Sequence, residues 1–184
     1  MQFQLIFKGF VLGRAGCGKS YLINTVNKYN TEVLGAPNLL KIAAPTGRIQ
    51  KSKKYVKPFI KLYLGTAAFN VSGETIHAMF QLPVPAPKKD PAPDLTGDQL
   101  TQLQRTFGGC KLIVIDEMSM ISPLRLFQMD KRLKEAFPEN AKKMFGGCSV
   151  VLMGDFAQLP PVMDKCLFEV NFMLNSLNLF QSLF

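Results

Sequence analysis

The residues from Gly13 to Ser20 read GRAGCGKS, a glycine-rich stretch closed by a lysine and a hydroxyl side chain. This spacing is G-x-x-x-x-G-K-[ST], which binds nucleotide phosphates when it joins a strand to a helix. Glycines let backbone N–H groups turn toward a phosphate, Lys19 reaches the β- and γ-phosphate oxygens, and Ser20 offers a hydroxyl to Mg²⁺. The stretch therefore predicts a site for ATP and Mg²⁺. Its candidate cofactor-binding residues are Gly13, Arg14, Ala15, Gly16, Cys17, Gly18, Lys19, Ser20 and Tyr21.

Two apolar runs downstream end in polar residues that suit the same chemistry. LIVIDE ends in Asp116, which can ligate Mg²⁺, and Glu117, which can orient or deprotonate the attacking water. SVVLMGD continues into FAQLPPV, where the amide of Gln158 can sense a γ-phosphate and position water. We therefore predict catalytic roles for Lys19, Glu117 and Gln158, and metal ligation by Ser20 and Asp116.

The elements that must position these residues alternate between strand and helix. Apolar runs predict strands at 4–13, 38–46, 111–117 and 149–155. Helical spacing of apolar residues predicts helices at 20–30 (Leu22, Val26, Tyr29), 97–107 (Leu100, Leu103, Phe107) and 122–137 (Leu126, Met129, Leu133, Phe137). Ser122 and Pro123 form a helix start, and the proline-rich range 83–98 predicts a loop. Together these elements predict an α/β fold with an open, mainly parallel sheet flanked by helices.

The composition favours some classes of protein over others. The chain has 184 residues, 47% of them hydrophobic and 19% charged, which suits one globular domain. Its net charge of +9 favours a polyanionic partner. Four scattered cysteines and one histidine favour a reduced intracellular compartment over a zinc site. We expect no membrane span, because no apolar run reaches roughly eighteen residues. We expect no secretory signal, because the start MQFQLIFKGF has no basic region followed by a longer apolar one.

One known family carries the same segments in the same order. The chain resembles the petite integration frequency (PIF) family of DNA helicases, relatives of RecD, in GRAGCGKSYLI, APTG with TAAFNVSGETIHAMF, IDEMSMIS and FGGCSVVLMGDFAQLPPV. The resemblance implies a RecA-like phosphate-loop domain that hydrolyses ATP to move five-prime to three-prime on single-stranded DNA. It also implies roles in DNA repair, recombination and telomere maintenance, and a location in the nucleus or mitochondrion if the source is eukaryotic.

The resemblance also implies DNA contacts and a domain layout. The implied contacts are Pro45, Thr46 and Gly47 after the second predicted strand, together with Thr75 and His77. We expect one motor domain at 1–168, followed by an apolar tail at 169–184. We expect the second motor domain to be absent, so that this chain alone does not unwind DNA.

The range 48–65 interrupts the family pattern. It contains Arg48, Lys51, Lys53, Lys54, Lys57 and Lys61 and no acidic residue, and its deletion would restore APTG followed directly by TAAFNVSGETIHAMF. Three explanations remain open: a functional loop that grips phosphates and stacks bases, a tolerated bulge, or a retained intron, which we favour.

Two alternatives to the helicase interpretation also remain. One is a different phosphate-loop ATPase or nucleotide kinase, which GETIHAMF and GDFAQLPP argue against. The other is a non-enzymatic gene fragment.

Overall fold

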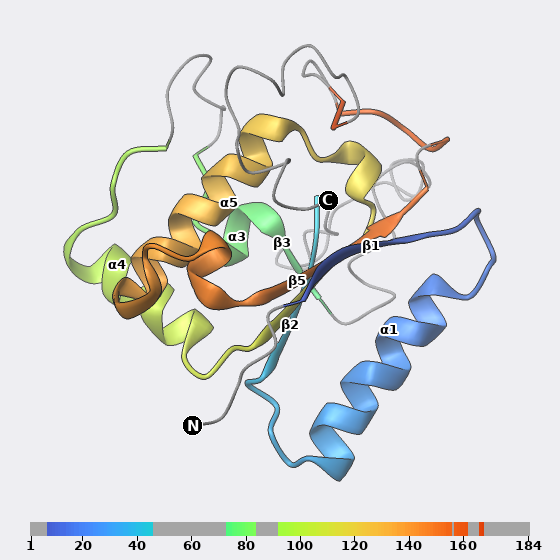
Figure 1. Ribbon diagram of the computed structural model, residues 1–184, viewed down its shortest axis with the longest axis horizontal. Helices are drawn as coiled ribbons and strands as arrows, with labels where there is room; N and C mark the ends of the chain where they lie inside the picture. The colour runs from blue at the N-terminus through green and yellow to red at the C-terminus, as the bar shows by residue number, and fades with distance from the viewer. Residues whose placement is uncertain (1–6, 46–72, 84–91, 156, 162–165, 168–184) are drawn as a thin grey trace, which may run out of the picture.

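The structure is a computed structural model that describes residues 7–45, 73–83, 92–155, 157–161 and 166–167. In these residues five parallel strands form one sheet in the order β1-β5-β4-β2-β3 (Figure 1). The strands are β1 (Lys8–Leu12), β2 (Leu40–Ala44), β3 (Glu74–Thr75), β4 (Leu112–Ile115) and β5 (Ser149–Gly154). The predicted open parallel sheet is confirmed, and each of the four predicted strands is present.

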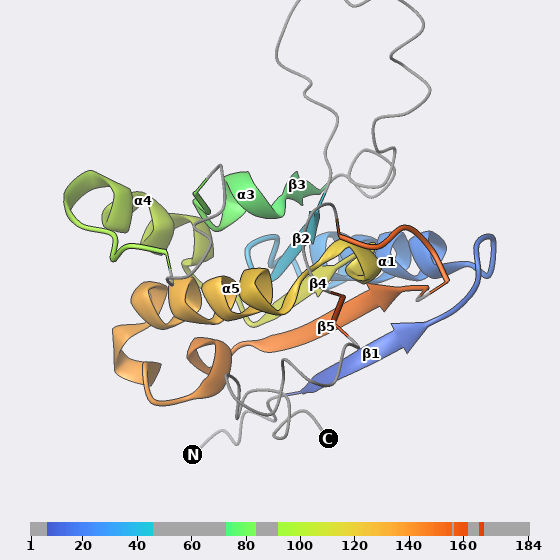
Figure 2. The same cartoon turned by 90° about the horizontal axis from the view of Figure 1, so that it is seen from above.

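Helices cover both faces of this sheet (Figures 1 and 2). The helices are α1 (Lys19–Lys28), α3 (Ile76–Met79), α4 (Gly97–Phe107) and α5 (Pro123–Ala136). Short turns of other helix types lie at Tyr29–Val33, Met118–Met120, Pro138–Asn140 and Met144–Gly147. The three predicted helices are confirmed, and α4 begins inside the last two residues of the predicted loop 83–98.

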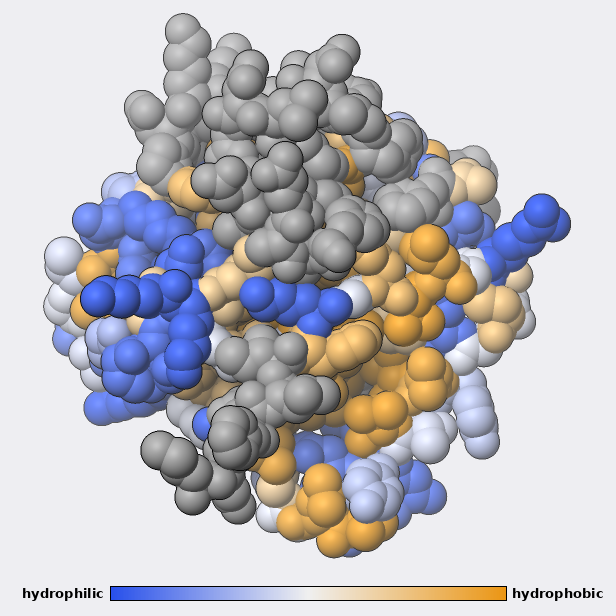
Figure 3. All heavy atoms as spheres, in the orientation of Figure 1, coloured by the Kyte–Doolittle hydropathy of each residue, from blue (hydrophilic) through white to orange (hydrophobic). Residues whose placement is uncertain are grey.

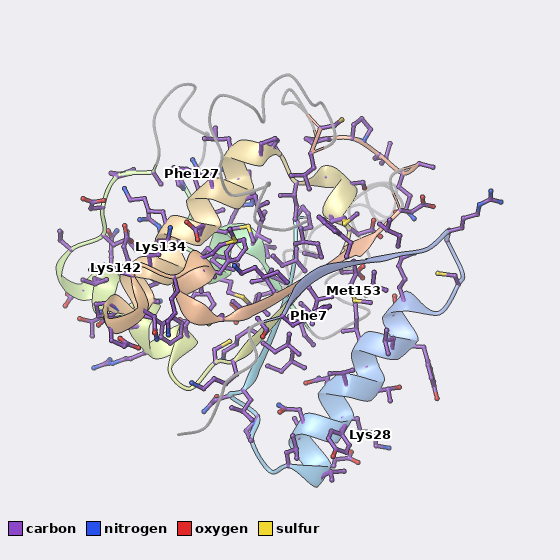
Figure 4. All side chains as sticks on the ribbon, viewed as in Figure 1. Phe7, Lys28, Phe127, Lys134, Lys142 and Met153 are labelled. Carbon is purple, nitrogen blue, oxygen red and sulfur yellow. The ribbon has the colours of Figure 1, made fainter. Side chains whose placement is uncertain are left out.

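Alternation along the strands assigns each side chain to one of two cores. Ile113 and Ile115 of β4 pack in the larger core with α3, α4 and α5, whereas Val114 packs with α1 in the smaller one. The same period of two divides β5, where Leu152 faces the larger core and Met153 points toward α1 (Figure 4). Because the larger core lies under three helices, most buried apolar side chains of the described residues belong to it.

The start of α5 follows from its sequence. Ser122 accepts a hydrogen bond from the backbone N–H of Arg125 at 3.3 Å, and Pro123 occupies the first turn. Leu126, Met129 and Leu133 are buried, as their spacing predicts. The cap and the apolar stripe together fix where α5 begins and which side it presents to the sheet.

The predicted inward face of α1 needs correction. Ile23 is buried and Val26 packs beside it, but Leu22 and Tyr29 are exposed. The spacing suggested a stripe through Leu22, Val26 and Tyr29, whereas the sheet contacts a stripe centred one residue further on. Figure 3 shows the resulting apolar surface on the side of β1 and α1, while hydrophilic residues gather over α4.

Two parts of the predicted layout lie wholly or largely outside the described residues. These are the apolar tail 169–184 and the interrupting range 48–65. The described segments on either side of the range 48–65 pair as parallel strands, with Ala43 of β2 opposite Glu74 of β3. The insertion itself stays a prediction. Within the described residues, none of the helices has the length and apolar character that crossing a membrane requires.

Candidate nucleotide site and DNA-facing edge

The glycine-rich loop joins β1 to α1, the context that its sequence pattern requires. Gly18 caps α1 with φ of 91°, a left-handed conformation that favours glycine. Its carbonyl oxygen accepts the N–H of Leu22 at 3.0 Å, which closes the first turn of the helix. Ser20 and Tyr21 follow in this first turn and are exposed. The loop therefore presents a helix N-terminus at the carboxyl end of β1.

Lys19 points back into the loop. Its ammonium group donates to the carbonyl oxygens of Gly13 and Arg14, the second at 3.0 Å, and lies 3.8 Å from the sulfur of Cys17. These contacts hold the only lysine of the loop beside the backbone that would surround a phosphate. A phosphate group would compete for the ammonium by replacing these neutral acceptors with charged ones, which bind a cation more strongly.

The two acidic residues after β4 lie in different environments. Asp116 is only 3% exposed and accepts the backbone N–H of Glu117 at 2.9 Å. Glu117 has φ of 57°, a left-handed backbone that turns the chain sharply away from the strand. The chain therefore changes direction directly after Asp116.

Burial raises the pKa of the carboxyl groups of both Asp116 and Glu117. For Asp116, the N–H of Glu117 and the positive charge of Lys19 oppose this rise. For Glu117, the negative charges of Asp116 and Asp155 add to the rise, and Lys19 again opposes it. Both carboxylates thus lie within electrostatic reach of the loop lysine, although 97 residues separate Lys19 and Asp116 in the sequence.

Gly154, at the end of β5, brings three segments together. Its carbonyl oxygen accepts the N–H of Gly13 at 3.1 Å. A Cβ atom on Gly154 would lie 3.0 Å from both Cγ and the backbone nitrogen of Met118, so the turn after Asp116 and Glu117 packs directly on this glycine. The sequence analysis missed this contact. The GD pair at the end of an apolar strand was its only signal.

Gln158 lies in the turn that follows β5. Its backbone N–H donates to the carbonyl oxygen of Asp155 at 3.0 Å, and its side chain is partly exposed. The turn starts at the carboxyl edge of the sheet, which it shares with the glycine-rich loop and Asp116. The structure therefore places Lys19, Glu117 and Gln158 on segments that meet around the end of β5.

The donor set at this edge fits Mg²⁺. A serine hydroxyl and one buried carboxylate are oxygen ligands, and Mg²⁺ in nucleotide sites is bound by one or two such groups together with phosphates and water. Burial raises the pKa of Asp116 because it disfavours the charged carboxylate, and a cation bound there would offset that effect. In the described ranges, no three His, Cys, Asp or Glu side chains gather as a metal cluster.

The residues that resemblance linked to DNA lie along the same edge. Pro45 follows β2, and Thr75 pairs with Ala44 across β2 and β3, so the two are neighbours in space despite their separation in sequence. Thr46 and Gly47 lie outside the described residues. Thr75 also caps α3, because its hydroxyl oxygen accepts the N–H of Ala78 at 3.1 Å.

His77 is partly buried in the short helix α3. Burial and the positive charge of Arg125 lower the pKa of its imidazole, which is therefore neutral near pH 7. The Arg125 guanidinium donates to the carbonyl oxygen of Pro83 at 3.1 Å and to the amide oxygen of Gln128 at 2.9 Å. This neighbour of His77 was not foreseen, since no sequence pattern connects residues 48 positions apart.

Comparison with known proteins connects this geometry to one family. A family model for PIF1-like helicases matches residues 48–182, more than half of the chain. The chain belongs to the PIF1-like helicase family. It is 31% identical over 167 residues to an ATP-dependent DNA helicase Pif1 of Campylobacter jejuni, and 28% identical over 162 residues to the mouse ATP-dependent DNA helicase PIF1.

Solved structures of PIF1-like helicases share the fold. The Bacteroides Pif1 helicase in complex with ADP-AlF3 and single-stranded DNA matches with a TM-score of 0.60 and 30% identity over 86% of this chain. Bacteroides Pif1 bound to single-stranded DNA matches with a TM-score of 0.57 and 29% identity over 89% of the chain. The predicted RecA-like fold and the predicted family are thereby confirmed.

This chain spans only part of its relatives. It covers 29% of the length of the Campylobacter protein, 21% of the mouse protein and 30% of the Bacteroides chain. The aligned part covers 85% and 86% of this chain in the two curated relatives. The roles of individual site residues stay predictions from motif and geometry.

Proposed function

We propose that this chain is the ATP-binding part of a DNA helicase, which couples ATP hydrolysis to five-prime to three-prime movement on single-stranded DNA. The observation that carries the proposal is the meeting of three segments at Gly154, which accepts the N–H of Gly13 and packs against Met118. This contact holds the glycine-rich loop, the acidic turn and the segment of Gln158 around one place.

Each residue has a distinct proposed task there. The N-terminus of α1 and the Lys19 ammonium bind and orient the β- and γ-phosphates of ATP. Ser20 and Asp116 hold Mg²⁺, which when bound neutralises phosphate charge and orients the phosphate oxygens. Glu117 orients the attacking water and takes up its proton, and the amide of Gln158 contacts the γ-phosphate.

The proposed DNA strand runs past the ends of β2 and β3. Pro45 and Thr75 lie side by side there, and the neutral imidazole of His77 follows two residues after Thr75. Backbone N–H groups, hydroxyls and a neutral imidazole make hydrogen bonds that position a phosphate backbone without reading its sequence. For the whole protein we propose work in DNA repair, recombination and telomere maintenance, in the nucleus or mitochondrion if the source is eukaryotic.

The rate of ATP hydrolysis with and without a single-stranded oligothymidylate tests this function. The proposal expects the oligonucleotide to raise the rate. In Glu117→Gln we expect ATP binding to persist while turnover falls by roughly 10² to 10⁴, the usual contribution of a general base. If the hydrolysis rate is the same with and without the oligonucleotide, the result would instead support a different phosphate-loop ATPase.

A further inference from the structure

The turn after β5 is held by both oxygen-bearing groups of Asp155. Its side-chain Oδ1 accepts the backbone N–H of Ala157 at 3.0 Å, and its main-chain oxygen accepts the N–H of Gln158 at 3.0 Å. A side-chain oxygen that accepts the N–H two residues ahead forms an Asx turn, which fixes the backbone locally. One residue therefore holds two successive N–H groups of the segment that ends at Gln158.

The base of this turn is itself anchored to the rest of the candidate site. Gly154 directly precedes Asp155, accepts the N–H of Gly13 and packs against Met118. Asp155 thus extends from a backbone that is fixed to both the glycine-rich loop and the acidic turn. Any orientation that Asp155 imposes on the following residues is an orientation relative to these two segments.

Gln158 follows directly from this turn. The Asx turn fixes the backbone from which its partly exposed side chain extends. A flexible, partly exposed glutamine loses conformational entropy when it binds a ligand, and a preformed turn lowers that loss. The Asx turn is the structural feature that supplies this preformed backbone.

We propose that Asp155 is a positioning residue that aims the Gln158 amide at the γ-phosphate, through its hydrogen bond to Ala157 and not through its charge. The inference rests on the proposed ATP site and adds Asp155 to the residues that act there. Asparagine keeps the accepting Oδ1 and removes the charge, whereas alanine removes both. The two substitutions therefore separate the hydrogen bond from the charge.

The test compares the affinities of the full chain for AMP-PNP and ADP in the presence of Mg²⁺, because only AMP-PNP offers a γ-phosphate. For Asp155→Ala and for Gln158→Ala we expect the preference for AMP-PNP over ADP to fall by about tenfold, the factor for one lost hydrogen bond to a charged group. The double variant should fall no further than either single one. Asp155→Asn should keep the wild-type preference, and so should Asp98→Ala, which removes an exposed carboxylate from the first turn of α4.

Several results would overturn the role of Asp155. The first is an Asp155→Ala variant that keeps the wild-type preference for AMP-PNP over ADP. The second is a double variant in which the two losses of preference add. The third is an Asp155→Asn variant that loses as much preference as Gln158→Ala does. If Asp155→Ala fails to fold, the comparison of Asp155→Asn with Gln158→Ala still decides. If the wild-type chain binds neither AMP-PNP nor ADP, both the proposed ATP site and the role of Asp155 are contradicted. If it binds them but the variants keep the wild-type preference, only the role of Asp155 is contradicted.

Discussion

At the scale of single residues, the buried carboxylate of Asp116 lowers the stability of the folded chain while it supplies a ligand for a cation. It is 3% exposed, and burial raises the pKa of its carboxyl group while the Glu117 N–H and the Lys19 charge compensate only in part. The pKa of this carboxyl group is therefore higher in the folded than in the unfolded state. At a pH between these two pKa values, the folded state binds more protons than the unfolded state does. The free energy of unfolding therefore falls as pH rises through that interval and stays lower above it.

Replacing Asp116 by Asn should therefore stabilise the nucleotide-free chain. We expect Asp116→Asn to raise Tm at about pH 7 and to flatten the loss of stability that begins above the ordinary aspartate pKa of about 3.9. The asparagine oxygen can still accept the N–H of Glu117, so the turn is kept. Thermal unfolding across this pH range measures the effect, and a Tm below the wild-type value at neutral pH would contradict the account. The same variant should lose the Mg²⁺ dependence of ATP binding.

At the scale of elements, the end of β5 is where the loop after β1 and the turn after β4 meet. Gly154 permits this because it has no Cβ, which would lie 3.0 Å from the backbone nitrogen of Met118. We expect Gly154→Ala to destabilise the fold by about 1–3 kcal/mol, as overpacking does, and to weaken ATP binding. Gly108→Ala is the matched control, since its Cβ would meet only atoms at an ordinary 3.4 Å. Equal thermal unfolding and equal ATP affinity in the two variants would count against this contact.

The segment that leads into β5 is fixed by a buried carboxylate on α5. Asp130 is 2% exposed, accepts the N–H of Phe145 at 2.6 Å and pairs with Lys134 at 2.6 Å. Asp130→Ala leaves a buried N–H without its acceptor and should cost about 1–3 kcal/mol. Asp130→Asn keeps the acceptor and should cost less. Denaturant unfolding compares the two variants, and equal losses would show that the ion pair matters more than the hydrogen bond.

The sequence predicted the elements better than their fine packing. Near-continuous apolar runs indicated β4 and β5, and the Ser122 cap indicated where α5 begins. By contrast, β3 has two residues, too few to show a period, so pairing with β2 alone makes it a strand. The inward face of α1 depends on how the helix packs on the sheet, which its spacing alone does not show. Ile23 is therefore buried, whereas Leu22 and Tyr29, which the spacing predicted to face inward, are exposed.

In the candidate site, the residues were predictable from the sequence but some of their contacts were not. The glycine-rich pattern and the Asp116–Glu117 pair were evident in the sequence because they stand at the ends of predicted strands. The contact of Gly154 with Met118 and the charge of Arg125 beside His77 were not evident, since both depend on tertiary packing.

At the scale of the whole molecule, the strand order puts the two proposed binding regions on one edge. The nucleotide residues follow β1, β5 and β4, and the DNA candidates follow β2 and β3. Adjacent strands lie about 4.8 Å apart, so the end of β3 is only about 10 Å from the end of β4 across the sheet. A shift of the acidic turn on ATP binding would therefore cross only one intervening strand to reach the proposed DNA contacts.

The most direct test of the nucleotide site is equilibrium binding of a fluorescent ATP derivative with Mg²⁺ to the wild-type chain, Lys19→Ala and Lys28→Ala. Lys28 ends the same helix, is exposed and pairs only loosely with Glu32 at 3.7 Å (Figure 4). We predict that wild type and Lys28→Ala bind alike and that Lys19→Ala binds about 10- to 100-fold more weakly, since a charged hydrogen bond to phosphate contributes about 1.5–3 kcal/mol. Equal affinity in Lys19→Ala, or no binding by wild type, would contradict the central claim.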